Sequence, residues 1–348
     1  MPRKRVIYQS EALFVGPIAT PLTPTEINRV QSANYSFEVT RTDVNEFGKL
    51  ARIDSIIVES PTVSLDFSYY PMTGAAETSL GFNVGTSGVV TSAITDILAG
   101  TSDTKNYYIY VAAEGNDAQG FTGTPAIIGI GNASLSSFSV EGSVGEIIQS
   151  TVNCEGLNMR FESAGTTLAN PAIDPSNGDD AAGTATLSDP TTFNPGDLTC
   201  LRPGDVILNL GNLDIGVGTS DLKVQSFNLS FDLSRTPLQA LGSRFATSRE
   251  IEFPVTITLT VEAVLGDLQD GTLSALLADD SATLNAGIRI NQPDGTFGMG
   301  YELKGAKLDS QEFSSSIGEN KTVSLTFSTQ VGGPQDTDNG LFMYDALA

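Results

Sequence analysis

Residues 224–242 read VQSFNLSFDLSRTPLQALG, and residues 30–48 read VQSANYSFEVTRTDVNEFG, so one pattern occurs twice in this chain. Aligned without a gap at an offset of 194, the two stretches agree at nine of nineteen positions, where composition alone would give roughly one or two. Convergent patterning of Ser- and Thr-rich strands would explain the alternation, but not an Arg-Thr pair and a later Gly in the same frame. We therefore interpret the pattern as an internal duplication. The identical positions of the first copy are Val30, Gln31, Ser32, Asn34, Ser36, Phe37, Arg41, Thr42 and Gly48.

Both stretches alternate apolar and polar residues with period 2, which is typical of a β-strand with one wet face. The alternation continues at the same offset, where Val63, Leu65 and Phe67 align with Ile257, Leu259 and Val261. A closing block repeats at an offset of 173, with Ala133, Leu135 and residues 143–146 aligned to Ala306, Leu308 and residues 316–319. The change from 194 to 173 gives copy one 21 extra residues between these blocks.

Further elements follow from pattern and length. The sequence predicts one short helix in each copy, and both helices are too short to be stable without packing on a sheet. Other period-2 runs predict strands, and turns rich in Gly, Asn and Asp follow them. The predicted helices are 91–99 and 272–278, and the further strands are 107–112, 286–290 and 321–327.

Two features leave alternatives open. Arg41-Thr42 and Arg235-Thr236 recur in both copies; each Arg pairs with an acid of its own domain, or contacts an adjacent subunit. The apolar residues 341–344 cover the chain's own core, or a neighbour's surface.

The domain boundaries follow from the repeats and from shifts in composition. Residues 164–194 are rich in Gly, Ala, Thr, Asp and Pro without a period, which predicts an exposed loop or linker. Within it, we expect residues 174–189 to form a surface loop that tolerates shortening. Pro17, Pro21 and Pro24 keep the first residues extended, as an arm that packs on a neighbouring surface or lies loose. The predicted organisation is an N-terminal arm 1–29, a first domain 30–163, a linker 164–200, a second domain 201–333 and a C-terminal tail 334–348.

The composition is strongly acidic, with 41 Asp and Glu against 18 Lys and Arg and a net charge of −23. Such a surface repels nucleic acid, although an acidic surface tuned to a salty environment would look the same. We find no secretory signal and no run long enough to span a membrane, so we expect synthesis in the cytoplasm. Cys154 and Cys200 are then expected to be free thiols.

The residues of common active sites are missing. Histidine is absent, which excludes Ser-His-Asp and Cys-His catalysis and the commonest zinc ligand. The cysteines form no CxxC motif, no glycine-rich loop ends in Lys-Ser or Lys-Thr, and the Asp-rich residues 173–180 lack the EF-hand pattern. The sequence therefore predicts no enzyme, and no catalytic, cofactor-binding or metal residue.

Three segments carry a resemblance to a known family: RVIYQSEALFVGP at residues 5–17, LRPGDVIL at 201–208, and YELKGAKLDSQEFSSSIGENKTVSLTFSTQVGG at 301–333. In overall pattern across most of its length, the chain resembles the tail tube proteins of tailed bacteriophages. The resemblance implies an all-β fold with short helices, here two tandem duplicated β-sandwich or barrel-like domains joined by a linker. Members of the family join their sheets into rings, mostly of six single-domain subunits, and the rings stack into a hollow tube. A two-copy chain departs from this, and three such chains would give a pseudo-sixfold ring.

The resemblance also implies the partners. The chain is expected to bind itself in stacked homotrimeric rings, and to bind other tail proteins: the tape measure, the baseplate or tip, and a terminator or sheath where present. Viral DNA would pass through an acidic lumen of the virion tail without specific binding, and no membrane insertion is expected. Two alternatives remain open: another ring protein of a phage tail or injection machine, such as a tail completion or secretion-tube component, and a tandem β-sandwich binding module or adhesin.

Overall fold

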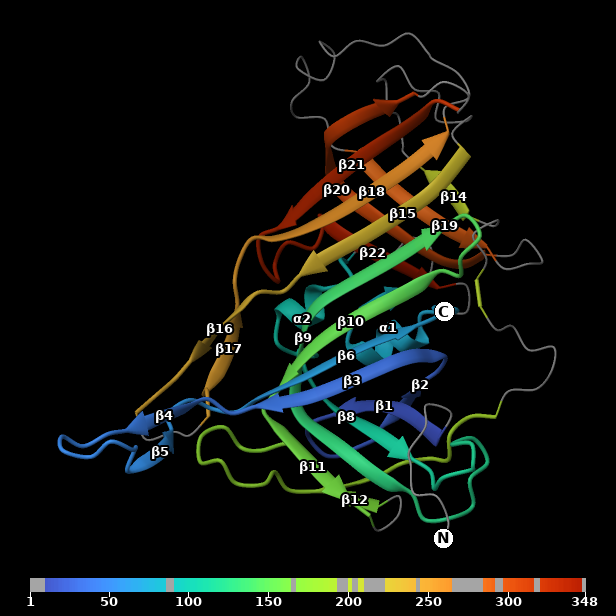
Figure 1. Ribbon diagram of the computed structural model, residues 1–348. Helices are drawn as coiled ribbons and strands as arrows, with labels where there is room; N and C mark the ends of the chain where they lie inside the picture. Colours follow the sequence, from blue (N-terminus) through green and yellow to red (C-terminus); the bar gives the residue numbers. More distant parts are fainter. Residues whose placement is uncertain are drawn as a thin grey trace.

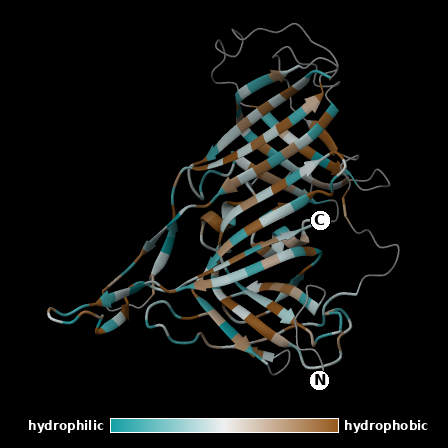
Figure 2. Ribbon diagram, in the orientation of Figure 1, coloured by the Kyte–Doolittle hydropathy of each residue, from teal (hydrophilic) through white to brown (hydrophobic). Residues whose placement is uncertain are grey.

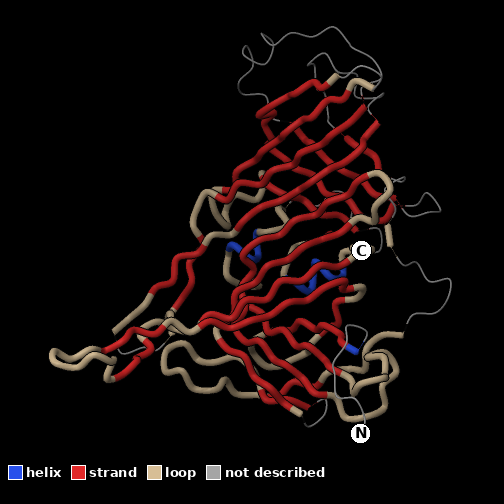
Figure 3. The backbone as a smooth tube through the Cα atoms, in the orientation of Figure 1, coloured by secondary structure: helices blue, strands red, loops and turns tan. Residues whose placement is uncertain are grey.

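The described residues of the computed structural model fold into an almost entirely β protein (Figures 1 and 3). Those residues are 10–85, 91–163, 167–192, 200–201, 206–209, 223–241, 245–264, 284–291, 297–315 and 320–345.

One continuous antiparallel sheet runs through both halves of the chain. Its strand order is β3, β6, β10, β9, β15, β18, β21 and β20, so the junction between the halves lies between β9 and β15. The sheet is open, with β3 at one end and the C-terminal part of β20 at the other; it does not close into a barrel. These strands are β3 (Val30–Glu38), β6 (Thr62–Tyr69), β9 (Ala126–Ser143), β10 (Gln149–Gly156), β15 (Lys223–Asp232), β18 (Val255–Val264), β20 (Phe297–Ser314) and β21 (Thr322–Val331).

The two longest strands, β9 and β20, pass from the large sheet into a second layer. Their N-terminal parts pair with other partners, so each half becomes a β-sandwich. In the first half the order is β2, β1, β8, β9 and β11. In the second it is β14, β19, β20 and β22, and β7 from the first half adds to β22. The added strands are β1 (Glu11–Pro17), β2 (Thr25–Ile27), β7 (Val84–Gly85), β8 (Thr104–Val111), β11 (Asn158–Glu162), β14 (Val206–Asn209), β19 (Leu284–Asn291) and β22 (Gly340–Asp345).

The core lies between the two layers and continues across both halves. Period-2 alternation places it there, as in β18, where Val255, Ile257, Leu259 and Val261 are buried and the intervening residues are not. Alternating hydrophilic and hydrophobic bands mark the same pattern along the strands of the large sheet (Figure 2). The predicted strand faces are therefore those of the structure on most strands.

The helices are shorter than predicted. Within 91–99 only α2 (Thr95–Leu98) is helical, and α1 (Ala75–Leu80) was not predicted, because six residues give no helical period. The predicted helix 272–278 lies outside the described residues. Neither described helix is long and apolar enough to cross a membrane.

Two β-hairpins project from the same side of the molecule (Figure 1). The first is β4 (Arg41–Val44) with β5 (Asp54–Ile57), and the second is β16 (Arg235–Leu238) with β17 (Ser248–Ile251). Their tips expose large apolar side chains, including Phe47, Leu50 and Leu241, which are fully accessible.

The termini and the predicted linker are more structured than the sequence indicates. Within the arm, β1 pairs along its whole length with β8. Within 164–200, β12 (Thr167–Ala169) pairs with β13 (Thr184–Thr186), and Leu168, Ala185 and Leu187 pack against Tyr108 and Tyr110. Apolar residues are too sparse there to form a period. Residues 341–343 are buried in β22, so the apolar tail covers the chain's own core rather than a neighbour's surface.

Strand pairing recurs in both halves at the sequence offsets. Val30 faces Tyr69 and Ser32 faces Ser68, with a bulge at Gln31; Val224 faces Ala263 and Ser226 faces Glu262, with a bulge at Gln225. Both Gln side chains donate to the main-chain carbonyl two residues before them, at 3.0 and 3.2 Å. A second bulge recurs at an offset of 173, at Ser136 in β9 and Asp309 in β20.

Candidate assembly interface

The junction between the halves is a complete antiparallel strand pair. Seven consecutive residues of β15 pair with β9, from Ser226 opposite Ser143 to Asp232 opposite Ser137. On the inner face, Leu229 lies opposite Val140 and Phe231 opposite Phe138, and all four are buried. Phe82 completes an aromatic cluster, with ring centroids 4.9 Å from Phe138 and 6.1 Å from Phe231.

Arg235 fastens this junction at the bulge of β9. Its guanidinium forms a bidentate ion pair with Asp103, at 2.5 and 2.9 Å, and donates to the Leu135 carbonyl at 3.3 Å. Leu233 N–H donates to the carbonyl of the bulged residue Ser136 at 2.7 Å. The Arg235 side chain is only 6% exposed. This Arg therefore pairs with an acid of its own chain, but one that lies in the other half.

At the two ends of the large sheet, apolar side chains are exposed at positions whose counterparts in the junction are buried. Phe37 of β3 is 62% exposed, whereas Phe231, at the matching position of β15, is 3% exposed. Phe313 of β20 is 46% exposed, whereas Val140, at the matching position of β9, is fully buried. Unpaired strand edges with apolar side chains are sites of pairing with another chain. β3 therefore matches β15 in sequence, and the C-terminal part of β20 matches β9. Neither has a partner strand on its outer edge in the described part of this chain.

The repeated Arg at the β3 end is also exposed. Arg41 opens the first hairpin at the position of Arg235 and faces Ile57 in it, yet its side chain makes no hydrogen bond or ion pair with the described residues.

The outer face of the large sheet is polar and acidic. Ser, Thr and Asn side chains hydrogen-bond across it, as between Asn34 and Asp66 at 2.7 Å, Ser36 and Ser64 at 2.7 Å, and Asn153 and Ser137 at 2.6 Å. The acids of this face, all at least partly exposed, are Glu38, Asp66, Glu141, Glu155, Asp232, Glu262 and Glu312.

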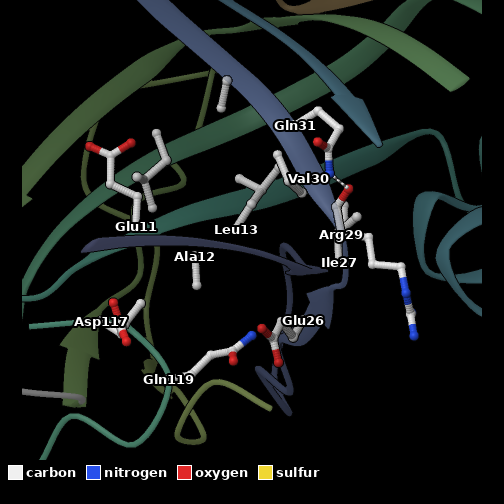
Figure 4. A pocket seen from close by; sticks show the side chains of 13 residues that line it. Glu11, Ala12, Leu13, Glu26, Ile27, Arg29, Val30, Gln31, Asp117 and Gln119 are labelled. Carbon is white, nitrogen blue, oxygen red and sulfur yellow. Dashed lines mark hydrogen bonds between the residues drawn. The ribbon is translucent and has the colours of Figure 1, made fainter. Parts of the chain in front are cut away.

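A cavity of about 340 Å³ opens beside the β3 end, between β1, β2 and β3 (Figure 4). Leu13, Ile27 and Val30 line its interior, and Glu11 and Glu26 lie at its walls. Burial raises the pKa of both carboxyls above the usual range for Glu. Ala33 also lines the cavity at the position where the second half carries the larger Phe227, which leaves this space unfilled.

A buried carboxyl lies where the first half meets β20 and β22. Glu77 of α1 is fully buried and accepts a hydrogen bond from the Tyr69 hydroxyl at 2.8 Å. Burial, with a smaller contribution from the nearby carboxylate of Asp345 in β22, raises the pKa of Glu77 to about 7. The main-chain N–H of Gly74 donates to the Asp345 carboxylate at 3.0 Å.

The cysteines are both free. Cys154 is buried beside the Tyr107 hydroxyl, and burial raises the pKa of its thiol to about 12, so it is not a reactive thiolate. In the described part of the chain no group of His, Cys, Asp or Glu is placed to hold a metal ion.

Sequence reasoning missed three parts of this interface. It gave no partner for Arg235, did not identify Glu77, and did not show which strands end the sheet. The recurrence of Arg-Thr at residues 41–42 and 235–236 was the available signal for the first.

No protein-family model matches this sequence, and no curated protein matches it. Among solved structures, a chain of the anti-feeding prophage baseplate matches with a TM-score of 0.30 and 12% identity, over 46% of this chain and 97% of its own. A chain from the virion of a native gene transfer agent matches with a TM-score of 0.22 and 12% identity, over 41% of this chain and 97% of its own. Scores of this size do not establish a shared fold or function.

Proposed function

We propose that this chain is a structural subunit of a bacteriophage tail tube, without enzymatic activity, and that residues 30–163 and 201–333 are two copies of one tube domain. One observation carries the proposal. The junction of β9 with β15 is a complete strand pair, whereas the matching strands, β20 and β3, each have an outer edge that pairs with no described strand. A second copy of the chain supplies the missing partner at each end.

The internal junction fixes the expected register between chains. Applying the offsets 194 and 173 to the β9–β15 pairs places Tyr35 opposite Phe313 and Ser36 opposite Glu312. Tyr35 and Phe313 lie on the inner face, and so does Phe37, two residues further along β3. The contact between chains would therefore cover the exposed rings of Phe313 and Phe37. Burying such a ring contributes about 1.5–3 kcal/mol.

Three chains close this ring if each domain occupies one of six positions. Each chain then contributes eight strands to one continuous sheet, and no strand edge of that sheet remains exposed. The ring has true threefold and approximate sixfold symmetry.

The polar face of the large sheet is the proposed lumen wall. Its Ser, Thr and Asn side chains are neutral, and its carboxylates repel phosphate, so DNA passes without binding. The proposed place of the protein is the virion tail, where stacked rings also contact the other tail proteins.

Cysteine cross-linking tests the register directly. In a Cys200→Ser background, Ser36→Cys with Glu312→Cys should form disulfides between chains, since facing strand residues lie at disulfide distance. The matched pair Ser139→Cys with Ser230→Cys, which face each other within one chain, should bridge internally and leave a monomer on a denaturing gel. The first variant should give a ladder that stops at three chains.

A slipped pair, Ser36→Cys with Ser314→Cys, is the control for register and should cross-link poorly. The proposal fails if negative-stain images show no rings, or if rings form without the expected cross-link.

A further inference from the structure

Ring closure places Arg41 against the strand end of the next chain, and this inference rests on the proposed function. We infer that Arg41 of one copy binds the bulge of β20 in a second copy, donating to the Leu308 carbonyl and pairing with the Asp309 carboxylate. The contact would fasten the boundary between chains as Arg235 fastens the boundary within a chain.

The bulge provides the acceptors. At the internal junction Arg235 donates to the Leu135 carbonyl, next to the bulged residue Ser136. β20 repeats that bulge, with Leu308 and Asp309 at the matching positions. The Leu308 carbonyl therefore takes the place of the Leu135 carbonyl, whatever side chains surround it.

The charged partner differs between the two boundaries. Arg235 pairs with Asp103. Lys105 faces Ala133, and Leu284 faces Ala306, the counterpart of Ala133 at the offset of 173, so Ala282 corresponds to Asp103 in sequence. Ala282 carries no charge and lies outside the described residues. The exposed end of β20 instead carries an acid at the bulge itself, where β9 has Ser136. Asp309 is exposed, as Arg41 is, so both charges are available to a neighbour.

This arrangement makes the boundary between chains separable from the boundary within a chain. Changes at Arg41 and Asp309 alter one contact, while Arg235 and Asp103 keep the halves of each chain joined. Because both target residues are exposed in the single chain, their variants are expected to fold.

Charge exchange tests the pair in the full-length chain. Sedimentation velocity over a concentration series gives the concentration at which half of the chains are in rings. Arg41→Asp and Asp309→Arg should each raise it about tenfold or more, as expected for loss of a close interfacial charge pair. Combining them should restore most of the wild-type value, and Arg41→Lys should have an intermediate effect, because Lys lacks the fork of donors.

Arg52→Asp is the matched control, since it makes the same charge change on the same hairpin, where Arg52 pairs with exposed Asp43 and with no other acid among the described residues. It should leave assembly unchanged. Normal assembly of Arg41→Asp would overturn the inference. So would a double variant that needs as high a concentration for half-assembly as the more impaired single variant. Both results would overturn the Arg41 contact but not the proposed ring. A wild-type chain that forms no ring would instead contradict the proposed function itself.

Discussion

Glu77 is a carboxyl held away from water where the two halves meet. It is 0% exposed, and among the described residues only one of its two oxygens has a hydrogen-bond partner. Burial disfavours its charged form and raises its pKa to about 7. Because the unfolded chain releases this proton near the ordinary pKa of Glu, the folded state binds more protons between about pH 4.5 and 7.

The stability of the folded chain should therefore fall as the pH rises through this window. Above it, the buried charge should cost about 3 kcal/mol, at 1.36 kcal/mol for each pKa unit. Glu77→Gln removes the titration, so its free energy of unfolding relative to wild type should increase between pH 5 and pH 8. Urea denaturation at both values measures this difference. A difference independent of pH would show that Glu77 is already ionised in the folded protein.

Arg235 marks the limit of what single residues in the sequence reveal. The repeated Arg-Thr pair left open a contact within a domain or one to a neighbour. The structure shows a contact within the chain but between its halves, to Asp103, which is 132 residues away. No local pattern relates these two positions, since their proximity arises from how β9 and β15 pair.

At the scale of elements, strands with one wet face were predictable and their partners were not. Period 2 in β3, β6, β15 and β18 follows from burying one face of a sheet. The pairing of β9 with β15 could not be read in this way, because main-chain hydrogen bonds join them and leave no trace in side-chain type. The recurring Gln31 and Gln225 are an exception, since both mark a bulge that fixes register.

The short helix α1 and the strands β12 and β13 escaped prediction for a related reason. Six residues, or three, are too few to show a period, and packing on the neighbouring sheet determines their conformation. Composition could address which common catalytic groups are available, because a chain without histidine lacks the most versatile acid–base group.

The first hairpin, β4 with β5, projects away from the sheets of the molecule (Figure 1). Its tip exposes Phe47 and Leu50 completely, and such apolar surface usually marks a binding site. Replacing residues 43–55 with an Asn-Gly turn should keep the chain folded and the rings intact, but should prevent rings from stacking into tubes. Electron micrographs would show single rings in place of tubes.

A matched deletion of residues 175–178, which form a turn elsewhere on the surface, should leave tubes unchanged. Tubes formed by the hairpin variant would show that stacking uses another surface, and loss of folding would show that the hairpin belongs to the core.

At the scale of the whole molecule, the proposed assembly treats the two halves as unequal versions of one unit. The sheet contains one junction between the halves, β9 with β15, and the strands at its two ends, β20 and β3, lie at the matching sequence offsets. Repetition of the same contact therefore produces either a closed ring or an open helix, depending on the rotation that each junction imposes. With six domain positions in a ring, closure needs three chains.

The last prediction concerns this ring and the charge of its wall. Native mass spectrometry should give three chains per ring, and averaged images should look sixfold at low resolution and threefold at high resolution.

The assembled protein should not retain duplex DNA at low salt, because the acids of the large sheet repel phosphate. Replacing Glu38, Glu141 and Asp232 with Lys should create DNA retention that disappears at higher salt. Equivalent replacement of Glu46, Asp117 and Asp174, exposed acids outside the large sheet, should create much less. Rings of six full chains would refute closure by three chains, and equal DNA retention by both triple variants would place the acidic face somewhere other than the lumen.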